Sequence, residues 1–104
     1  MHKYENLFLQ DENFEWDKNK ERRNLEKHGI DFSMAVESFE DPDGIKMADP
    51  AHTTVFEERF YWIGKTKDER ILTTWFTKRG QKIRIIGSAE FRKFRRMYES
   101  TKVK

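Results

Sequence analysis

Runs of β-branched and aromatic residues dominate the second half of the chain and are separated by short polar links. This pattern predicts strands at residues 44–48, 60–64 and 71–78, followed by a further strand that contains residues 83–86. A shorter run at residues 14–16 also predicts a strand. Because short links join strands that are neighbours in a sheet, the later strands are expected to form an antiparallel meander.

The last two of these strands are expected to pair as a hairpin about which the rest of the sheet is organised. With Arg79 and Gly80 as a two-residue loop, Phe76 lies opposite Ile83. A three-residue loop with a glycine bulge would instead set Phe76 opposite Lys82. The first register is favoured because it buries Leu72, Thr74, Phe76, Ile83 and Ile85, and leaves a mixed face of Thr73, Trp75, Thr77, Lys82, Arg84 and Ile86.

The first predicted helix carries almost no apolar residues. Asp17 supplies an N-cap, the helix runs to about His28, and Gly29 suits the position just after its end. Leu25 is the one strong hydrophobe of this helix, and it shares a face with Glu21, Asn24 and His28. Such a helix must be held by polar contacts or face a ligand.

Two further helices have clear apolar stripes. Asp31 caps a helix that ends before Pro42 and whose core face consists of Phe32, Ala35, Val36 and Phe39. Ser88 is expected to cap the last helix, which has Glu90 in its first turn and ends near Ser100. Its apolar stripe is Phe91, Phe94, Met97 and Tyr98, and its basic face is Arg92, Lys93, Arg95 and Arg96.

The predicted order of elements is β-α-α-β-β-β-β-α, which indicates an α+β domain. We expect a small antiparallel sheet of three to five strands, packed with two N-terminal helices and one C-terminal helix. Residues 14–100 form this single domain. Residues 1–13 are expected to be a leader, either frayed or an extra edge segment, and residues 101–104 a frayed tail.

Composition narrows the class of protein. Of the 104 residues, 38% are charged and 14% are aromatic, so the chain is too aromatic for disorder and too charged to span a membrane. No long apolar run and no signal peptide are visible, and a cytoplasmic location without membrane contact is expected. With no cysteine, disulfides, thiol nucleophiles and zinc–thiolate sites are excluded.

The net charge of +2 conceals a strong asymmetry between the two halves of the chain. Residues 1–58 hold 7 Lys and Arg against 15 Asp and Glu, a net charge of −8, whereas residues 59–104 hold 14 against 4, a net charge of +10. This asymmetry favours a surface in the second half that faces a polyanion or a partner of complementary charge. The alternative is that the two halves neutralise each other in the folded protein.

The side chains available for chemistry point to RNA. The three histidines, His2, His28 and His52, lack the spacing of metal ligands, and no phosphate-binding loop or nucleophile elbow is present, so neither a metal nor a cofactor is expected. Cations can hold phosphates while aromatics stack on unpaired bases. The same residue types suit metal-free cleavage, which must deprotonate the 2′-OH, protonate the leaving 5′-oxygen and stabilise the phosphorane. Plain nucleic-acid binding explains the composition about equally well.

Several short segments share an order and spacing with a known family. They are Phe14-Glu15-Trp16-Asp17, Asn24-x-x-Lys27-His28-Gly29-Ile30-x-Phe32, Ala35-x-x-x-Phe39-x-Asp41-Pro42, Glu57-Glu58-Arg59-x-x-x-Ile63-Gly64, Thr77-x-Arg79-Gly80 and Ile83-Arg84-Ile85-Ile86. Over roughly residues 14–99 the chain resembles the BrnT toxin family. It departs from many members after the last strand, where Ser88-Ala89 is followed by Glu90 instead of Arg; Phe91-Arg92-Lys93 resembles another branch of the family.

This resemblance implies a RelE-like ribonuclease fold and arrest of translation by RNA cleavage. It also implies a BrnA-like ribbon-helix-helix antitoxin encoded alongside, which dimerises, masks the toxin and binds its own promoter. A heterotetramer of toxin and antitoxin is therefore expected, with promoter DNA contacted only through the antitoxin. The predicted function is that of a toxin acting as a metal-independent endoribonuclease. The alternative is a non-catalytic RNA- or ribosome-binding module, or a degenerate toxin that acts as a complex partner.

Four residues are the catalytic candidates. Arg84 lies mid-strand, where a phosphate or transition-state contact is favoured over a surface ion pair. Glu58 is a candidate base, although residues 57–59 would also make an ion-pair cluster at a strand edge. His28 is a candidate proton donor, against a simple helix-end contact with backbone carbonyls. Arg79, at the hairpin tip, is as easily an ordinary exposed cation.

The candidate RNA-binding residues are mostly cations. They are Lys27, Arg59, Thr77, Arg92 and Lys93. For the last two, the alternatives are a solvated basic face or a surface on which an acidic antitoxin segment docks. Trp62 and Trp75 would suit base stacking, but large aromatics in strands are more often core, and neither is assigned to the site.

Overall fold

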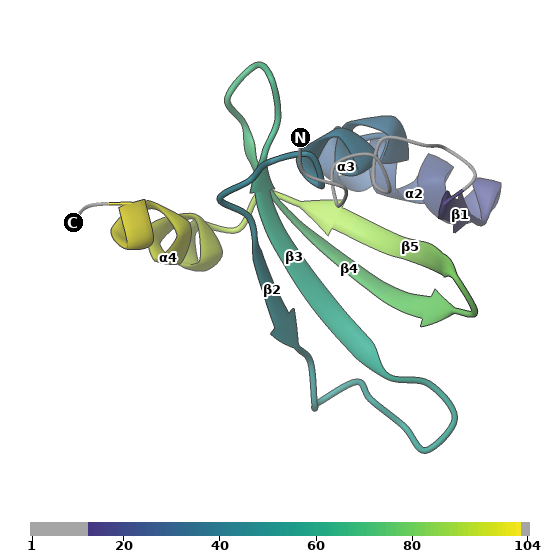
Figure 1. The fold of residues 1–104 in the computed structure, drawn as a ribbon. Coiled ribbons are helices and arrows are strands. Elements are labelled where there is room, and N and C mark those ends of the chain that lie inside the picture. Colours follow the sequence, from purple (N-terminus) through teal and green to yellow (C-terminus); the bar gives the residue numbers. More distant parts are fainter. Residues whose placement is uncertain (1–12, 103–104) are drawn as a thin grey trace.

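The computed structural model describes residues 13–102 of the chain. In chain order it contains β1 (Phe14–Trp16), α2 (Lys18–His28), α3 (Phe32–Ser38), β2 (Ile45–Ala48), β3 (Arg59–Lys65), β4 (Ile71–Arg79), β5 (Lys82–Ala89) and α4 (Arg92–Lys102). The predicted α+β class and order of elements are confirmed (Figure 1). The expected leader, except for residue 13, and the last two residues of the expected tail lie outside the described part.

The five strands form one sheet in the order β1-β5-β4-β3-β2. Strands β2 to β5 are an antiparallel meander, as predicted, whereas β1 pairs in parallel with β5, so the sheet is mixed. In Figure 1, α2 and α3 lie together beside β5, and α4 lies apart from them near β2 and β3. Among the described residues, no helix is long and apolar enough to cross a membrane.

The β4–β5 hairpin closes one step later than predicted. Arg79 pairs with Lys82, so the loop is Gly80-Gln81, and Phe76 lies opposite Ile85 instead of Ile83. The first loop position takes a left-handed backbone, with φ of 60° at Gly80, which glycine adopts far more easily than arginine. The observed register differs from the predicted one by two residues, so each side chain stays on the face of the hairpin predicted for it.

A bulge then interrupts the pairing between Trp75 and Phe76. Beyond it, Trp75 faces Gly87 and Thr74 faces Ser88. A Cβ atom at position 87 would lie 2.2 Å from the ring of Trp75, so only glycine leaves room for the indole. The bulge and Gly87 together fix where Trp75 sits on the sheet.

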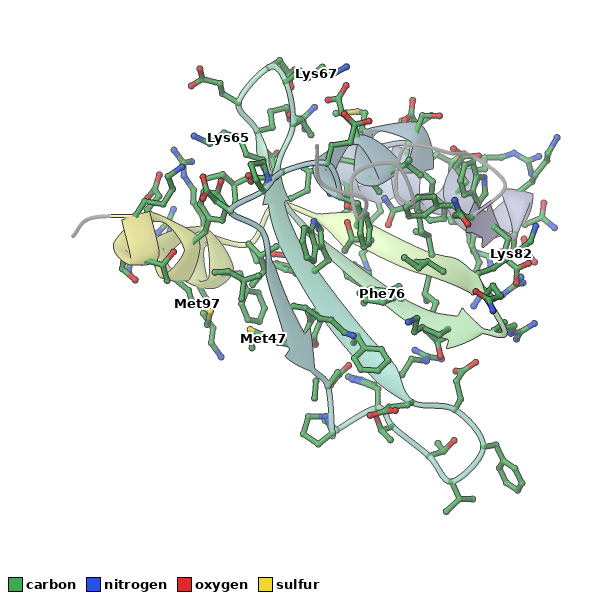
Figure 2. All side chains as sticks on the ribbon, in the orientation of Figure 1. Met47, Lys65, Lys67, Phe76, Lys82 and Met97 are labelled. Carbon is green, nitrogen blue, oxygen red and sulfur yellow. The ribbon has the colours of Figure 1, made fainter. Side chains whose placement is uncertain are left out.

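The main core lies between the sheet and α3. The predicted stripe of α3 is buried, and Trp62 belongs to the same core, with its ring stacked on Phe39 at a centroid distance of 5.1 Å and its Nε1 donating to the Ser38 carbonyl. Phe76 is 2% exposed and packs on Phe39 and Phe60 (Figure 2). The buried members of this core are Phe14, Phe32, Ala35, Val36, Phe39, Trp62, Phe76, Ile83 and Ile85.

A smaller core attaches α4 to the other face of the sheet. Tyr98 is buried against Ile63 and Ile71, and Met47 and Met97 pack on this cluster (Figure 2). The Tyr98 hydroxyl donates to the Asp41 carboxylate at 2.5 Å. Burial and, next, this hydrogen bond raise the pKa of Tyr98 above its ordinary value of 10. Tyr98 and the partly buried Phe94 thus fix the helix on the sheet, and the helix continues to Lys102, two residues past the predicted end.

The predicted start of α4 is wrong. Ser88 is fully buried within β5, where its hydroxyl contacts the Thr74 hydroxyl at 2.9 Å, and the helix begins only at Arg92. Glu90 therefore precedes the helix instead of lying in its first turn. The strand continues through Ser88, whose backbone N–H and C=O both form hydrogen bonds with the Asn24 side chain on α2.

Helix α2 is docked through polar side chains, as its composition predicts. Leu25 is 48% exposed, and Asn24 is the buried residue of the helix. The Asn24 amide donates to the carbonyls of Ile30 and Ser88 at 2.9 and 2.8 Å and accepts from the Ser88 N–H at 3.1 Å. Glu21 accepts from Trp16 Nε1 and from the Phe32 N–H. The predicted caps, Asp17 and Gly29, are both confirmed.

We predict that Asn24→Ala destabilises the fold by about 2–4 kcal/mol, because it leaves three buried backbone groups without partners. The neighbouring Leu25→Ala should cost less than about 1 kcal/mol, since this side chain is half exposed. Urea unfolding of both variants measures the two free energies. A larger loss for Leu25→Ala would mean that α2 is docked by apolar burial after all.

Candidate functional site

The face of the sheet opposite α3 carries two rows of side chains that run across the strands. In the polar row, Glu15, Arg84, Thr77 and Arg59 are successive register partners on β1, β5, β4 and β3. In the aromatic row, Gly87, Trp75, Tyr61 and Met47 are successive partners on β5, β4, β3 and β2. We call the surface formed by these two rows the open face. The predicted placement of Trp75, Thr77 and Arg84 on one face is confirmed.

Carboxylates hold both arginines of the polar row. Arg84 Nη1 lies 3.2 Å from Glu15 Oε2, and both side chains are about one-third exposed. Arg59 Nε lies 2.6 Å from Glu57 Oε1, and Arg79 Nη2 lies 3.8 Å from the other oxygen of Glu57. The ion pair that was the alternative interpretation of Arg84 is therefore present in the fold. It uses one of the five N–H donors of the guanidinium.

Trp75 is the centre of the aromatic row. It is half-buried and is not part of the core, where large aromatics in strands more often lie. Its ring stacks on Phe91 at a centroid distance of 6.0 Å and meets the His28 ring edge-on at 6.3 Å. His28 also contacts Phe91 at 6.5 Å. His28, the candidate proton donor at the end of α2, thus lies against Trp75 on the open face.

Two hollows share Trp75 as a wall. One, of about 260 Å³, we call the His52 pocket, and it is lined by Asp49, His52, Arg59, Tyr61, Trp75 and Phe91. The other, of about 320 Å³, we call the His28 pocket, and it is lined by Lys20, Arg23, Asn24, Lys27, His28, Trp75 and Ile86. The first is walled mainly by aromatics, whereas the second is strongly cationic.

The His52 pocket contains an acid–imidazole pair that sequence reasoning missed. Asp49 follows β2 directly, is 6% exposed, and holds His52 Nδ1 at 2.8 Å from its Oδ2. Burial and the Asp49 carboxylate raise the pKa of Tyr61 above its ordinary value of 10. The signal was present as Asp-x-x-His after a strand, but His52 had been weighed only as a metal ligand.

The sequence-predicted site residues fall into two groups. Arg84, Thr77 and Arg59 form the polar row, and Arg79 joins them through Glu57. Lys27 and His28 line the neighbouring His28 pocket. The Glu58 side chain is exposed, and the Glu58 backbone carbonyl accepts a hydrogen bond from the Thr77 hydroxyl at 2.6 Å. The carboxylate that binds Arg59 and Arg79 is that of Glu57.

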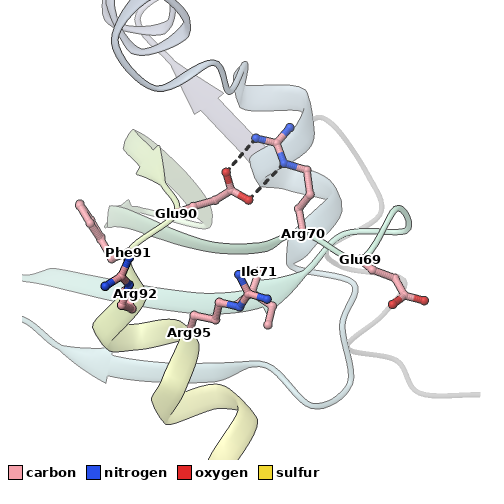
Figure 3. A pocket seen from close by; sticks show the side chains of 7 residues that line it. All are labelled: Glu69, Arg70, Ile71, Glu90, Phe91, Arg92 and Arg95. Carbon is pink, nitrogen blue, oxygen red and sulfur yellow. Dashed lines mark hydrogen bonds and ion pairs between the residues drawn. The ribbon is translucent and has the colours of Figure 1, made fainter.

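Arg92 and Lys93 lie on the exposed side of α4. Arg92 borders a third hollow, of about 500 Å³, together with Arg70, Glu90 and Arg95 (Figure 3). There the Glu90 carboxylate accepts two hydrogen bonds from the Arg70 guanidinium, at 3.1 and 3.3 Å. Lys93 Nζ lies 5.5 Å from the centroid of the Phe94 ring. These two candidates therefore line neither the His52 pocket nor the His28 pocket.

The charge asymmetry of the sequence is partly neutralised in the fold. Four ion pairs join the acidic first half to the basic second half: Glu15–Arg84, Glu57–Arg59, Glu57–Arg79 and Asp43–Lys102. Within residues 13–102, no ion pair involves the cations of the His28 pocket or the candidates Arg92 and Lys93. These cations remain available to a polyanion or an acidic partner.

Comparison with known proteins agrees with the resemblance seen in the sequence. Residues 16–96 match the model of a family described as the ribonuclease toxin, BrnT, of type II toxin–antitoxin systems. A structure search also finds the 1.1 Å crystal structure of the Brucella abortus ribonuclease toxin BrnT, with 22% sequence identity and a TM-score of 0.48, covering 73% of this chain and 91% of that one. No curated protein matches the chain.

The Glu57 carboxylate should make the stability of the polar row depend on pH. Its hydrogen bond with Arg59 lowers the pKa of Glu57 below the ordinary value of 4.5. The stabilisation is therefore fully present above pH 4.5 and is lost as the pH falls through the lowered pKa.

We predict that Glu57→Gln lowers the free energy of unfolding at neutral pH by less than about 1 kcal/mol, because the pair is partly exposed. Well below pH 4.5 the difference from the unmodified protein should vanish. Urea titrations at the two pH values measure it, and a difference that grows on acidification would contradict this assignment of the ion pair.

Proposed function

The chain belongs to the BrnT family of ribonuclease toxins of type II toxin–antitoxin systems, and from this premise we propose that its open face cleaves RNA without a metal ion. The observation that supports this most is the row Arg84–Thr77–Arg59 beside the half-buried Trp75. Guanidinium groups bind phosphate oxygens in a fork, while aromatic side chains at a binding surface contact unpaired bases. Cations and an aromatic on adjacent rows thus fit a single-stranded RNA backbone and one of its bases.

The proposed reaction is attack of a 2′-OH on the adjacent phosphorus. It needs a base for the 2′-OH, an acid for the leaving 5′-oxygen and cations for the extra charge on phosphorus. Arg84 is the proposed clamp on the phosphorane, with Arg79 and Arg59 as further cations. His28 is the proposed acid, because its ring lies against Trp75 and lines the pocket beside the polar row.

RNA binding extends, in this proposal, from the open face into the His28 pocket. Lys27 lies there with Lys20 and Arg23, all of them exposed or near the surface of α2. The helix that carries so few apolar residues therefore presents its cations to the strand of RNA. Its polar attachment through Asn24 keeps these cations beside Trp75.

A type II toxin has an antitoxin, and we propose that here it is a BrnA-like ribbon-helix-helix protein. Its dimerisation would give a heterotetramer, and promoter DNA would be contacted only through the antitoxin. The exposed cations Arg92 and Lys93 of α4 suit either RNA phosphates or an acidic antitoxin segment. In this proposal the free toxin inhibits translation in the cytoplasm.

A second function is favoured by two observations. Arg84 is already engaged by Glu15, and Glu90 follows Ser88-Ala89 where the resemblance described above implies an arginine in many members of the family. Both fit a module that binds RNA or the ribosome without cutting, or a degenerate toxin that persists as a complex partner. Activity measurements distinguish this function from the first.

We predict that the purified protein cleaves single-stranded RNA in the presence of a chelator and leaves the DNA of the same sequence intact. The reason is that the proposed nucleophile is the 2′-OH, which DNA lacks. Gel electrophoresis of end-labelled oligonucleotides measures both. A requirement for Mg²⁺, or cleavage of the DNA strand, would show that the proposed mechanism is wrong.

Arg84→Ala should lower the cleavage rate by about 10²–10³-fold and abolish toxicity, because it removes a donor to the phosphorane. Antitoxin binding should stay nearly unchanged. Growth after induced expression, with and without the antitoxin gene, provides the measurement.

Arg22→Ala is the matched control, because this exposed arginine lies on α2, bonds only Asn19 among the described residues, and borders neither pocket. It should remain fully toxic. Growth arrest by folded Arg84→Ala protein as complete as that by Arg22→Ala would rule out an essential role for Arg84.

A further inference from the structure

The loop between β2 and β3 is closed at its base by a set of hydrogen bonds around Asp49. The Asp49 N–H donates to the Arg59 carbonyl at 2.9 Å, and the Asp49 carbonyl accepts from the Thr53 hydroxyl at 2.9 Å. The Arg59 N–H in turn donates to the hydroxyl oxygen of Thr53 at 2.9 Å. These contacts fix the backbone on which both members of the Asp49–His52 pair are carried.

The two members of this pair differ greatly in exposure. The Asp49 side chain is 7% exposed, whereas that of His52 is 64% exposed. An ionised carboxylate only accepts hydrogen bonds, so the 2.8 Å contact places a ring proton on Nδ1 of His52. The other ring nitrogen, Nε2, has no hydrogen-bond partner within residues 13–102.

The surroundings of His52 suit a nucleotide. Trp75 and Phe91, whose rings stack on each other, wall the same pocket with Tyr61, while Arg59 brings a cation of the polar row to its edge. On the sheet, the Tyr61–Trp75 pair lies one step along the same face from the Arg59–Thr77 pair. A ribose beside the Trp75 ring would therefore have the imidazole and the arginines within one site.

We propose that His52 is the general base of the RNA cleavage and that Asp49 orients it. This inference rests on the proposed function and names the residue that starts the reaction. The geometry favours His52 over Glu58, whose exposed side chain makes no hydrogen bond or ion pair among the described residues. A buried carboxylate that fixes the tautomer and then stabilises the imidazolium is the arrangement that makes histidine an effective base.

In the proposed step, His52 Nε2 takes the proton of the 2′-OH while the 2′-oxygen forms a bond to the adjacent phosphorus. The bond from phosphorus to the 5′-oxygen breaks, and the leaving oxygen takes a proton from His28. The products are a 2′,3′-cyclic phosphate and a 5′-hydroxyl, and the two histidines return to their starting protonation states through solvent. His52 and His28 line two pockets that share Trp75 as a wall, so in this proposal base and acid act on one ribose–phosphate unit bound beside that ring.

A purely structural role for the pair would be to hold the loop closed. Three proteins and one added reagent separate the two roles: His52→Ala, His52→Gln, the control Val55→Ala, and imidazole in solution. Glutamine retains an N–H donor for Asp49 but cannot transfer a proton. Val55 lies in the same loop with its side chain 93% exposed and contacts neither pocket.

Cleavage of a single-stranded RNA is measured for each protein, together with thermal unfolding and RNA affinity. Both His52 variants should lose about 10²–10⁴-fold in rate while binding RNA and melting nearly as the unmodified protein does. Added imidazole should raise the RNA cleavage rate of His52→Ala by at least about tenfold, because the position is open to solvent. The control Val55→Ala should cleave RNA as fast as the unmodified protein does, and imidazole should not change its rate.

Two results would overturn this assignment while leaving the proposed function intact. One is a His52→Gln protein that cleaves RNA at the unmodified rate. The other is an inactive His52→Ala protein that imidazole does not rescue, which would show a structural role. A failure of the unmodified protein to cleave RNA would instead overturn the proposed function, and the assignment of His52 with it.

Discussion

In the β4–β5 hairpin, Thr77 pairs with Arg84 and Phe76 with Ile85, and one extra residue on β5 then turns the pairing so that Trp75 faces Gly87. This register divides the hairpin into an apolar face and a polar one. Phe76 and Ile85 enter the core beneath α3 because of it, and Arg84 comes into line with its partners on the neighbouring strands. The bulge adds the space in which the Trp75 ring lies over a glycine. Core and open face therefore depend on the same set of backbone hydrogen bonds.

The chemistry of the open face follows from how it is surrounded. Helix α4 covers the end of the face that holds Ile63 and Ile71, and α2 approaches Trp75 through His28. What stays accessible is a strip with arginines along one side, aromatics along the other and an imidazole in each adjoining pocket. Each arginine of the row is held by a carboxylate, which lowers its freedom before any ligand arrives. A phosphate that binds there must compete with those carboxylates for the guanidinium groups or bind to N–H donors that the carboxylates do not use.

Much of this arrangement could be predicted from the sequence where the signal is local. Asp17, Gly29 and Asp31 have the cap positions their side chains predict, and the stripe of α3 is buried because its spacing matches one helix face. The two faces of the hairpin were predicted in spite of a wrong loop, since a shift of two residues preserves the side-chain alternation. Fold class and family were within reach of such patterns.

Features that depend on distant partners could not be predicted in the same way. Ser88 has the residue type of a helix cap, but Asn24, 64 positions earlier, binds its backbone and keeps it in a strand. Glu15 reaches Arg84 only because β1 adds to the sheet in parallel. Trp75 is half-buried because Phe91 and His28, which come from other parts of the chain, pack against its ring.

The central claim is cleavage by 2′-OH attack, and end-group analysis of the RNA products tests it most directly. It predicts fragments that end in a 2′,3′-cyclic phosphate, or the 3′-phosphate derived from it, followed by fragments that begin with a 5′-hydroxyl. Fragments with a 3′-hydroxyl and a 5′-phosphate would contradict it.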